Sequence, residues 1–253
     1  MLRSATHIWR FLTTGSIMRA VVKAAPGVGM EVVERPVPDV GSRDVLIKVH
    51  HAGVCGTDLH IWEWDAWASA RLKPPVVIGH EFAGEIVALG AEAEREGLFH
   101  VGDLVTAEGH IVCGHCIPCR TGNAHLCART RIIGVDRDGA FADFIAMPAD
   151  NVMKLDGIPT DIGAIMDPIG NGVHTALEGG AVPGSTVLVL GCGPIGCFAV
   201  GVLRAAGASL VLASDFNPFR RQLAATMGAH HTFDPATDDV VAKCRELTGG
   251  IGV

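Results

Sequence analysis

Short runs of apolar residues, broken by turn residues, dominate the first part of the chain. Val, Ile, Phe and Ala recur within the runs, and Gly, Pro and Asp separate them. Runs of this length and composition are typical of β-strands. They predict a compact β domain up to about residue 160, either a folded-over barrel or a sandwich. The predicted strands lie within residues 18–25, 30–37, 44–51, 81–90, 102–109 and 140–147.

After Pro159 the pattern changes to strands that alternate with helices. Residues 185–190 (STVLVL) form a continuous apolar run of the kind that buried parallel strands show. Alternation of this type predicts an open parallel sheet. The predicted helices lie at 160–180, up to about 206, at 217–227 and at 238–248, and two further strands lie at 210–215 and 231–234.

We therefore expect an α/β plus β architecture with two domains, residues 18–160 and 161–253, and an extension at 1–17 ahead of an alternative start at Met18. The 253-residue chain carries a formal net charge of −7, without a dense Lys/Arg stripe. No uninterrupted apolar stretch reaches the length of a membrane span. These features argue against nucleic-acid and membrane partners and favour a small-molecule ligand and a cytoplasmic location.

Four cysteines, Cys113, Cys116, Cys119 and Cys127, follow the spacing C-x2-C-x2-C-x7-C. Four thiolates this close in sequence can converge on one tetrahedral zinc ion. An iron–sulfur cluster is the first alternative, but its usual run has a gap of three before the last Cys, followed by Pro, whereas Ala128 follows here. Disulfides are the second alternative, and they require an oxidising compartment that nothing else in the chain indicates. The spacing therefore favours a structural zinc lobe at residues 108–130.

A glycine-rich turn, Gly191-Cys192-Gly193-Pro194-Ile195-Gly196, directly follows the predicted strand at 185–190 and opens a helix. In this context the G-x-G-x-x-G pattern predicts a dinucleotide-binding loop, with the pyrophosphate at the helix N-terminus. Asp215 ends the next predicted strand and is expected to accept hydrogen bonds from the ribose hydroxyls, which favours NAD over NADP. Arg220 is either a second cofactor contact or a solvated residue at a helix start.

A second metal site is predicted from Cys55, His80 and Glu81. One soft, one borderline and one hard ligand suit a zinc ion that keeps an exchangeable position. Alone, a cysteine is usually a core residue, and a glutamate beside a histidine usually lies at the surface. The combination with a nucleotide-binding loop favours the metal site, and Asp167 is a further carboxylate that could reach the same ion.

These motifs together resemble the zinc-dependent medium-chain alcohol dehydrogenases over nearly the whole of residues 18–253. The family's zinc motif G-H-E-x2-G-x5-G is matched by Gly79, His80, Glu81, Gly84 and Gly90. The resemblance implies a GroES-like catalytic domain followed by a Rossmann domain. Within the superfamily, the segments CGTDLHIWEWDAW, EGHIVCGHC and DPIGNGVHTAL are most similar to the L-threonine 3-dehydrogenases.

The resemblance implies that zinc, bound by the predicted ligands, lowers the pKa of the substrate hydroxyl while NAD accepts a hydride. Thr57 and His60 match the family positions that pass the proton to solvent by way of the cofactor ribose. For L-threonine the product would be 2-amino-3-oxobutanoate. The ammonium and carboxylate of such a substrate need further partners, and the candidates are Glu108, His110, Trp64 and Asp65.

The chain departs from the family pattern at its end, because it stops where the fourth strand of the nucleotide domain is expected. We expect the chain to be inactive or weakly active for that reason, whereas full-length homologues are expected to be homo-oligomers. Two alternatives remain open: a polyol or secondary-alcohol dehydrogenase of the sorbitol or butanediol type, and a non-catalytic zinc-binding fragment.

Overall fold

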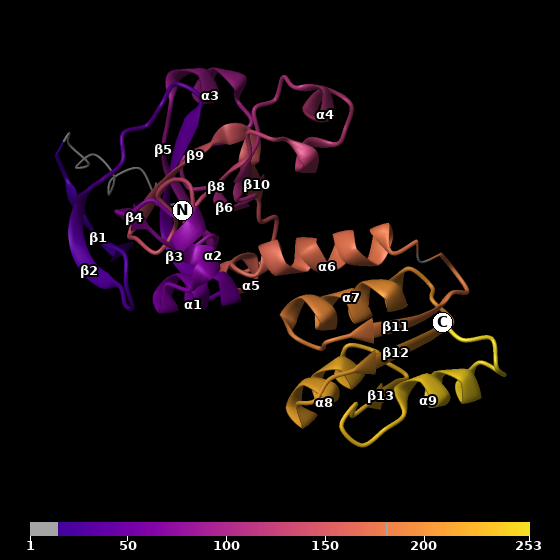
Figure 1. The fold of residues 1–253 in the computed structure, drawn as a ribbon. Coiled ribbons are helices and arrows are strands. Elements are labelled where there is room, and N and C mark those ends of the chain that lie inside the picture. The colour runs from indigo at the N-terminus through magenta and orange to yellow at the C-terminus, as the bar shows by residue number, and fades with distance from the viewer. Residues whose placement is uncertain (1–14, 181) are drawn as a thin grey trace, which may run out of the picture. The chain divides into compact units, whose positions relative to one another are not determined.

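The computed structural model describes residues 15–253 apart from residue 181, and these residues form two compact units. The first unit ends at Asp167, and the second runs from Pro168 to Val253 (Figure 1). The division falls in the first turn of helix α6 (Met166–Glu178). Most of the extension predicted at 1–17 lies outside the described residues.

The first unit is built on antiparallel strands, as its apolar runs predicted. A three-stranded sheet has the order β2-β1-β4, and a five-stranded sheet has the order β10-β6-β5-β3-β9. Val45, Ile47, Phe82 and Ile86 lie at the centre of the main core, and each is at most 1 % exposed. The strands are β1 (Ile17–Lys23), β2 (Glu31–Pro36), β3 (Asp44–Gly53), β4 (Val76–Val77), β5 (Glu81–Leu89), β6 (Leu104–Ala107), β9 (Phe144–Pro148) and β10 (Val152–Lys154), with β7 (His110–Ile111) paired to β8 (Arg131–Ile132).

Short helices also occur in this unit, and the apolar pattern did not predict them. Helix α1 (Gly56–Glu63) and helix α2 (Ala66–Arg71) begin at side-chain caps rather than at an apolar repeat. Asp58 accepts the Cys55 N–H at 2.8 Å, and Asp65 accepts the Ala68 N–H at 2.9 Å. Elements of two turns are too short for a helical period to be read from sequence. The others are α3 (Ala91–Glu96), α4 (Ile117–Arg120) and the 3-10 turns Ala124–Leu126 and Ala149–Asn151. Helix α5 (Thr160–Gly163) was predicted, because it lies within the helix expected at 160–180, which the structure divides into α5 and α6.

The second unit contains the predicted parallel sheet. Its described strands have the order β11-β12-β13, and Leu190 at the end of β11 pairs with Ser214 at the end of β12. Val200, Val211 and Ala213 are fully buried between the sheet and helix α7. The elements are β11 (Thr186–Leu190), α7 (Pro194–Ala205), β12 (Leu210–Ser214), α8 (Pro218–Thr226), β13 (His231–Phe233) and α9 (Val240–Leu247).

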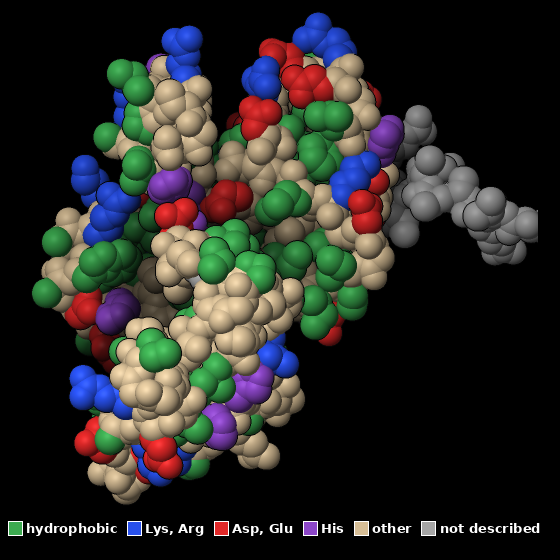
Figure 2. All heavy atoms as spheres, turned by 90° about the vertical axis from the view of Figure 1, so that its right-hand side faces the viewer, with side chains coloured by type: hydrophobic (Ala, Val, Ile, Leu, Met, Phe, Trp, Pro, Cys, Tyr) green, Lys and Arg blue, Asp and Glu red, His purple; other side chains and the backbone are tan. Residues whose placement is uncertain are grey.

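The surface of the described residues mixes charges of both signs. Basic and acidic side chains are interspersed on the face drawn in Figure 2. Among the described residues, no helix combines the length and the apolar character needed to cross a bilayer.

The close pairing of β3 with β5 requires glycine at one position. A Cβ atom added to Gly84 would overlap the carbonyl oxygen of Lys48 on the neighbouring strand. That oxygen belongs to the backbone, so it cannot move aside as a flexible side chain could. Gly109, by contrast, has only ordinary van der Waals neighbours around such a Cβ, the nearest being Ile133 at 3.4 Å.

We expect Gly84→Ala to lower the free energy of unfolding by about 1–3 kcal/mol, the usual effect of overpacking. Gly109→Ala is the matched control and should change it by much less. Urea denaturation followed by circular dichroism measures both. Equal stability of the two variants would show that the strands can separate to admit a side chain.

Candidate active site

The end of β3 and the start of β5 bring together the first predicted group of metal ligands. Gly53, the last residue of β3, pairs with Glu81, the first residue of β5. Cys55 follows as the N-cap of α1, and His80 directly precedes β5. One ligand atom from each of Cys55, His80 and Glu81 lies within 4.8 Å of the others.

The Cys55 thiol and the His80 imidazole form an electrostatic pair. Their hydrogen bond lowers the pKa of Cys55 more than burial raises it. Burial disfavours the charged form of His80, but the contacts with Cys55, Asp58 and Asp167 outweigh it and raise the pKa of His80. The pair therefore favours a thiolate, which is the form of cysteine that binds metal.

Glu81 is 6 % exposed, and its burial raises the pKa of its carboxyl group. A buried carboxylate needs a cationic or hydrogen-bonding partner, and a divalent cation would provide one. His80 Nδ1 is a buried atom without a hydrogen-bond partner among the described residues. A buried polar atom that lacks a hydrogen-bond partner fits a site that a bound metal ion would complete.

Asp58 is a functional candidate that the sequence analysis missed. It is 4 % exposed, its Oδ1 has no hydrogen-bond partner among the described residues, and its charge acts on His80. Carboxylates beside metal-binding histidines orient the ring and raise its basicity. The available signal was the spacing C-x2-D, because it places an acid at the third position of a helix that Cys55 caps.

Glu108, His110 and Asp167 form a second polar group in the first unit, with ligand atoms within 4.8 Å of one another. Glu108 Oε1 lies 2.6 Å from His110 Nδ1 and also accepts the His110 N–H at 2.8 Å. The contact between their side chains lowers the pKa of Glu108 and raises that of His110, while burial raises the pKa of Asp167. Asp167 interacts with His80 as well, which links the two groups electrostatically.

Thr57 and His60 lie on α1, three residues apart, and therefore on neighbouring positions of the same helix face. Thr57 Oγ1 lies 3.7 Å from Cys55 Sγ. The His60 side chain is 57 % exposed, and its Nδ1 lies 2.6 Å from Asp65 Oδ2. Asp65, a predicted substrate partner, is thus engaged with His60. Trp64, another of the four predicted partners, is the C-cap of α1.

The four cysteines of the lobe converge as their spacing predicted. One sulfur from each lies within 4.8 Å of the others, and Cys116 Sγ is 3.3 Å from Cys119 Sγ. All eight cysteines of the chain are free, so the structure contains no disulfide among its described residues. Backbone N–H groups of Cys113 and Arg129 lower the pKa of Cys127 to about 6. The donor set suits a closed tetrahedral zinc site.

The glycine-rich turn lies between β11 and α7 in the second unit. Gly191 has a φ of +88° and donates its N–H to the Ser214 carbonyl at 2.8 Å. A Cβ on Gly196 would overlap the Gly191 carbonyl oxygen, whereas the position at Gly193 is open. Gly196 is therefore needed for packing of the turn, and the open Gly193 suits the approach of a phosphate. Ile195, also predicted to bind the cofactor, lies in the first turn of α7 and is 43 % exposed.

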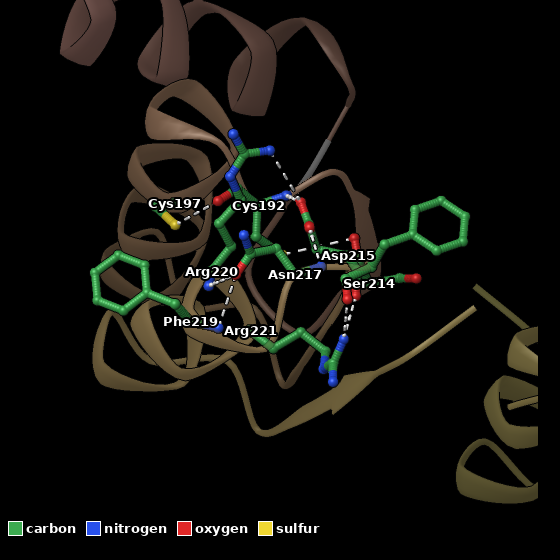
Figure 3. A network of polar contacts seen from close by, with 9 residues as sticks. Cys192, Cys197, Ser214, Asp215, Asn217, Phe219, Arg220 and Arg221 are labelled. Carbon is green, nitrogen blue, oxygen red and sulfur yellow. Dashed lines mark hydrogen bonds and ion pairs between the residues drawn. The ribbon is translucent and has the colours of Figure 1, made fainter. Parts of the chain in front are cut away.

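Asp215 fixes this turn from the end of β12 (Figure 3). Its Oδ2 accepts the Cys192 N–H at 2.8 Å, and its Oδ1 accepts the Asn217 N–H at 2.7 Å. Burial raises the pKa of Asp215, but these two hydrogen bonds, of which the one from Asn217 has the larger effect, lower it overall. The side chain is therefore a carboxylate at neutral pH. Arg220 lies 3.9 Å from the Asp215 carboxylate. Arg221, which the sequence analysis missed, donates to the Asp215 carbonyl at 2.7 Å.

Family models match both parts of the chain. The alcohol dehydrogenase GroES-like domain matches residues 41–157, and the zinc-binding dehydrogenase domain matches residues 194–253. The two matches follow the order that the sequence motifs predicted.

Individual relatives agree with these matches. The L-threonine 3-dehydrogenase of Symbiobacterium thermophilum is 48 % identical over 236 residues, which are 93 % of this chain and 66 % of that protein. A solved Sinorhizobium meliloti 1021 protein bound to NADP superimposes with a TM-score of 0.81 at 34 % identity, covering 89 % of this chain and 64 % of that one. An alcohol dehydrogenase of Escherichia coli CFT073 in complex with NADH gives 0.82 at 30 % identity, covering 93 % and 67 %. The chain spans about two thirds of the length of the curated relatives it matches.

We expect Cys119→Ser to remove about one equivalent of zinc and to lower the thermal stability of the first unit, because binding to a structural site is coupled to folding. Cys244→Ser is the control, since Cys244 is buried in a hydrophobic cluster of the second unit and is not one of the four lobe cysteines. Inductively coupled plasma mass spectrometry and calorimetry measure the two effects. Unchanged zinc content in Cys119→Ser would contradict the assignment.

Proposed function

Since the chain belongs to the zinc-dependent medium-chain alcohol dehydrogenases, we propose that the protein oxidises the 3-hydroxyl group of L-threonine with NAD, giving 2-amino-3-oxobutanoate. In this reaction the C3 hydroxyl becomes a carbonyl, a hydride moves from C3 to the nicotinamide, and one proton is released. Polyol and secondary-alcohol oxidation by the same donors is the competing possibility.

The observation that carries the choice of substrate is the polar group of Glu108, His110 and Asp167. Its contact with His110 keeps Glu108 ionised at neutral pH, and a carboxylate in that position can receive the ammonium of an amino acid. A simple alcohol has no ammonium group, so it offers no cation for these carboxylates to bind. The name carried by the 48 % identical relative supports the same substrate.

The chemistry of the first metal group follows from its donors. When bound, zinc lowers the pKa of the substrate hydroxyl and NAD accepts the hydride. Cys55, His80 and Glu81 would hold the metal, with Asp58 orienting His80 and Asp167 as a further carboxylate within electrostatic range.

Two residues of α1, Thr57 and His60, would release the proton to solvent. The Thr57 hydroxyl can accept a proton and give up its own, because a hydroxyl is both donor and acceptor. The half-exposed His60 imidazole can accept the proton and pass it to water, because one ring nitrogen of a neutral imidazole is an acceptor and the ring lies within reach of solvent.

The nucleotide is assigned to the turn of the second unit. Gly191 and Gly193 leave space for the pyrophosphate at the N-terminus of α7, Gly196 lets the helix start pack against the Gly191 carbonyl, and the Asp215 carboxylate would repel a 2′-phosphate. This electrostatic argument favours NAD, the cofactor of the Escherichia coli neighbour in complex with NADH. Because another structural neighbour is bound to NADP, the affinities of this protein for NAD and NADP should be measured side by side.

We expect the protein, loaded with zinc, to reduce NAD at a low rate in the presence of L-threonine. Cys55→Ser should lower kcat by more than about a hundredfold, since even outer partners of a metal ligand cost ten- to hundredfold. The variant should keep the zinc of the lobe. Absorbance of NADH and metal analysis check both. Oxidation of 2,3-butanediol without oxidation of L-threonine would favour the competing substrate class instead.

We expect Gly193→Ala and Gly196→Ala to separate nucleotide binding from folding. An added methyl group at the open Gly193 should clash only with bound nucleotide, at about 1–3 kcal/mol, which is roughly tenfold or more in Kd. At Gly196 the methyl group meets the Gly191 carbonyl, so stability should fall as well. NADH fluorescence titration and thermal unfolding distinguish them, and equal thermal midpoints would show that the turn tolerates a side chain at both positions.

A further inference from the structure

His60 and Asp65 form a carboxylate–imidazole pair at the junction of α1 and α2. His60 Nδ1 lies 2.6 Å from Asp65 Oδ2, a distance typical of a strong hydrogen bond with an ionised partner. The His60 ring also faces Trp67, with a centroid distance of 6.2 Å. The aromatic contact and the carboxylate together restrict the orientation of an otherwise exposed imidazole.

Each oxygen of Asp65 has a separate task. Oδ1 accepts the Ala68 N–H at 2.9 Å and caps α2, which leaves Oδ2 for His60. The hydrogen bond from the Ala68 N–H is the largest influence and lowers the pKa of Asp65. Burial raises that pKa, and the hydrogen bond with His60 lowers it further. Because an ionised carboxylate only accepts hydrogen bonds, the proton between Asp65 and His60 belongs to the imidazole Nδ1.

The turn that carries Asp65 is itself held in one conformation. Trp64 has a φ of 56°, the one positive value at a described residue other than glycine, and the Asp65 N–H donates to the His60 carbonyl at 3.4 Å. Lys23 is fully buried, with its ammonium 5.0 Å from the centre of the Trp64 ring. The same ammonium donates to the Gly27 carbonyl and, at 2.9 Å, to the Gly29 carbonyl. The cation–π contact thus supports the strained residue next to Asp65.

We propose that Asp65 is a positioning residue that holds His60 in the Nδ1–H tautomer, so that Nε2 is the free acceptor for the proton released by substrate oxidation. The inference rests on the role proposed for His60 above. When Nε2 gains the proton, the ring becomes an imidazolium whose Nδ1–H still faces the Asp65 carboxylate. Nε2 then gives the proton to water, which returns the ring to its first tautomer with no change in electron count.

Asp65→Asn is the informative substitution because it separates the two tasks. The amide oxygen can still accept the Ala68 N–H, while the amide N–H₂ that replaces Oδ2 donates to Nδ1 and selects the opposite tautomer. We expect kcat for L-threonine to fall by about tenfold to a hundredfold, within the range that general base catalysis contributes. The KM for NAD and the thermal midpoint should stay unchanged. Added imidazole should restore turnover, because an external base can replace the lost acceptor.

Two controls distinguish positioning from a purely structural effect. Asp239→Asn makes the same change at another N-cap, where Asp239 accepts the Ala242 N–H at 2.9 Å, and should leave kcat unchanged. In a His60→Gln background, Asp65→Asn should cause no further loss, because Asp65 acts through the missing ring. A full additional loss in that background, or an unchanged kcat in Asp65→Asn alone, would overturn the proposal.

The tautomer can also be read without any turnover. Nitrogen-15 NMR of the imidazole, assigned by its absence in His60→Gln, should show Nδ1 protonated in the parent protein and Nε2 protonated in Asp65→Asn. An Nε2–H tautomer in the parent protein would refute the inference. This measurement keeps the inference separable from the proposed function, since a protein that does not oxidise L-threonine would still show the expected tautomer.

Discussion

Gly53 at the end of β3 lies opposite Glu81 at the start of β5, and a Cβ atom at Gly53 would overlap the Glu81 carboxylate. The absence of a side chain at this position lets a buried acid lie beside the neighbouring strand. The antiparallel register then determines that Cys55, just after β3, and His80, just before β5, meet at the same edge of the sheet. Metal binding at this edge would therefore depend on strand pairing, and the pairing depends on Gly84, where an added Cβ would overlap the Lys48 backbone carbonyl.

The two cysteine-containing groups differ in the interactions that set the pKa values of their side chains. The lobe lowers the pKa of Cys127 through backbone N–H donors, which are supplied locally by a short loop. The group at Cys55 instead combines buried side chains from distant segments, and burial raises the pKa of Glu81 and Asp58 while their partners lower it. A local loop can be read from spacing alone. The charge state of a buried group of acids can be derived only when the packing around it is known, since burial disfavours the ionised form.

The extent to which the sequence predicted this structure follows the same distinction. Apolar residues predicted strands such as β5, most of which is buried, and the continuous apolar run of β11, which is only partly buried among the described residues. The four-cysteine spacing predicted that the four sulfur atoms lie close together, and they do. The glycine pattern predicted a turn after β11, and the structure contains it. Helices α1 and α2 were missed because capping carboxylates, and not periodicity, begin them. Arg221 was missed because its partners are two backbone carbonyls, which spacing does not reveal. For Asp58 the C-x2-D spacing indicated a helix cap, but its charge contact with the buried His80 ring required the structure.

Helix α1 shows how few residues such a site requires. A helix turns by about 100° per residue, so positions three apart share a face. Asp58 and Ile61 form the buried face of α1, at 4 % and 0 % exposure, and fix the helix against the core. Thr57 and His60, one position earlier in each case, consequently share the adjacent face, next to Cys55 at the N-cap. The spacing of hydroxyl, carboxylate and imidazole within this eight-residue helix therefore uses one face for packing and leaves the adjacent face for the proton transfer proposed above. A shift of one residue would move Thr57 and His60 off that adjacent face.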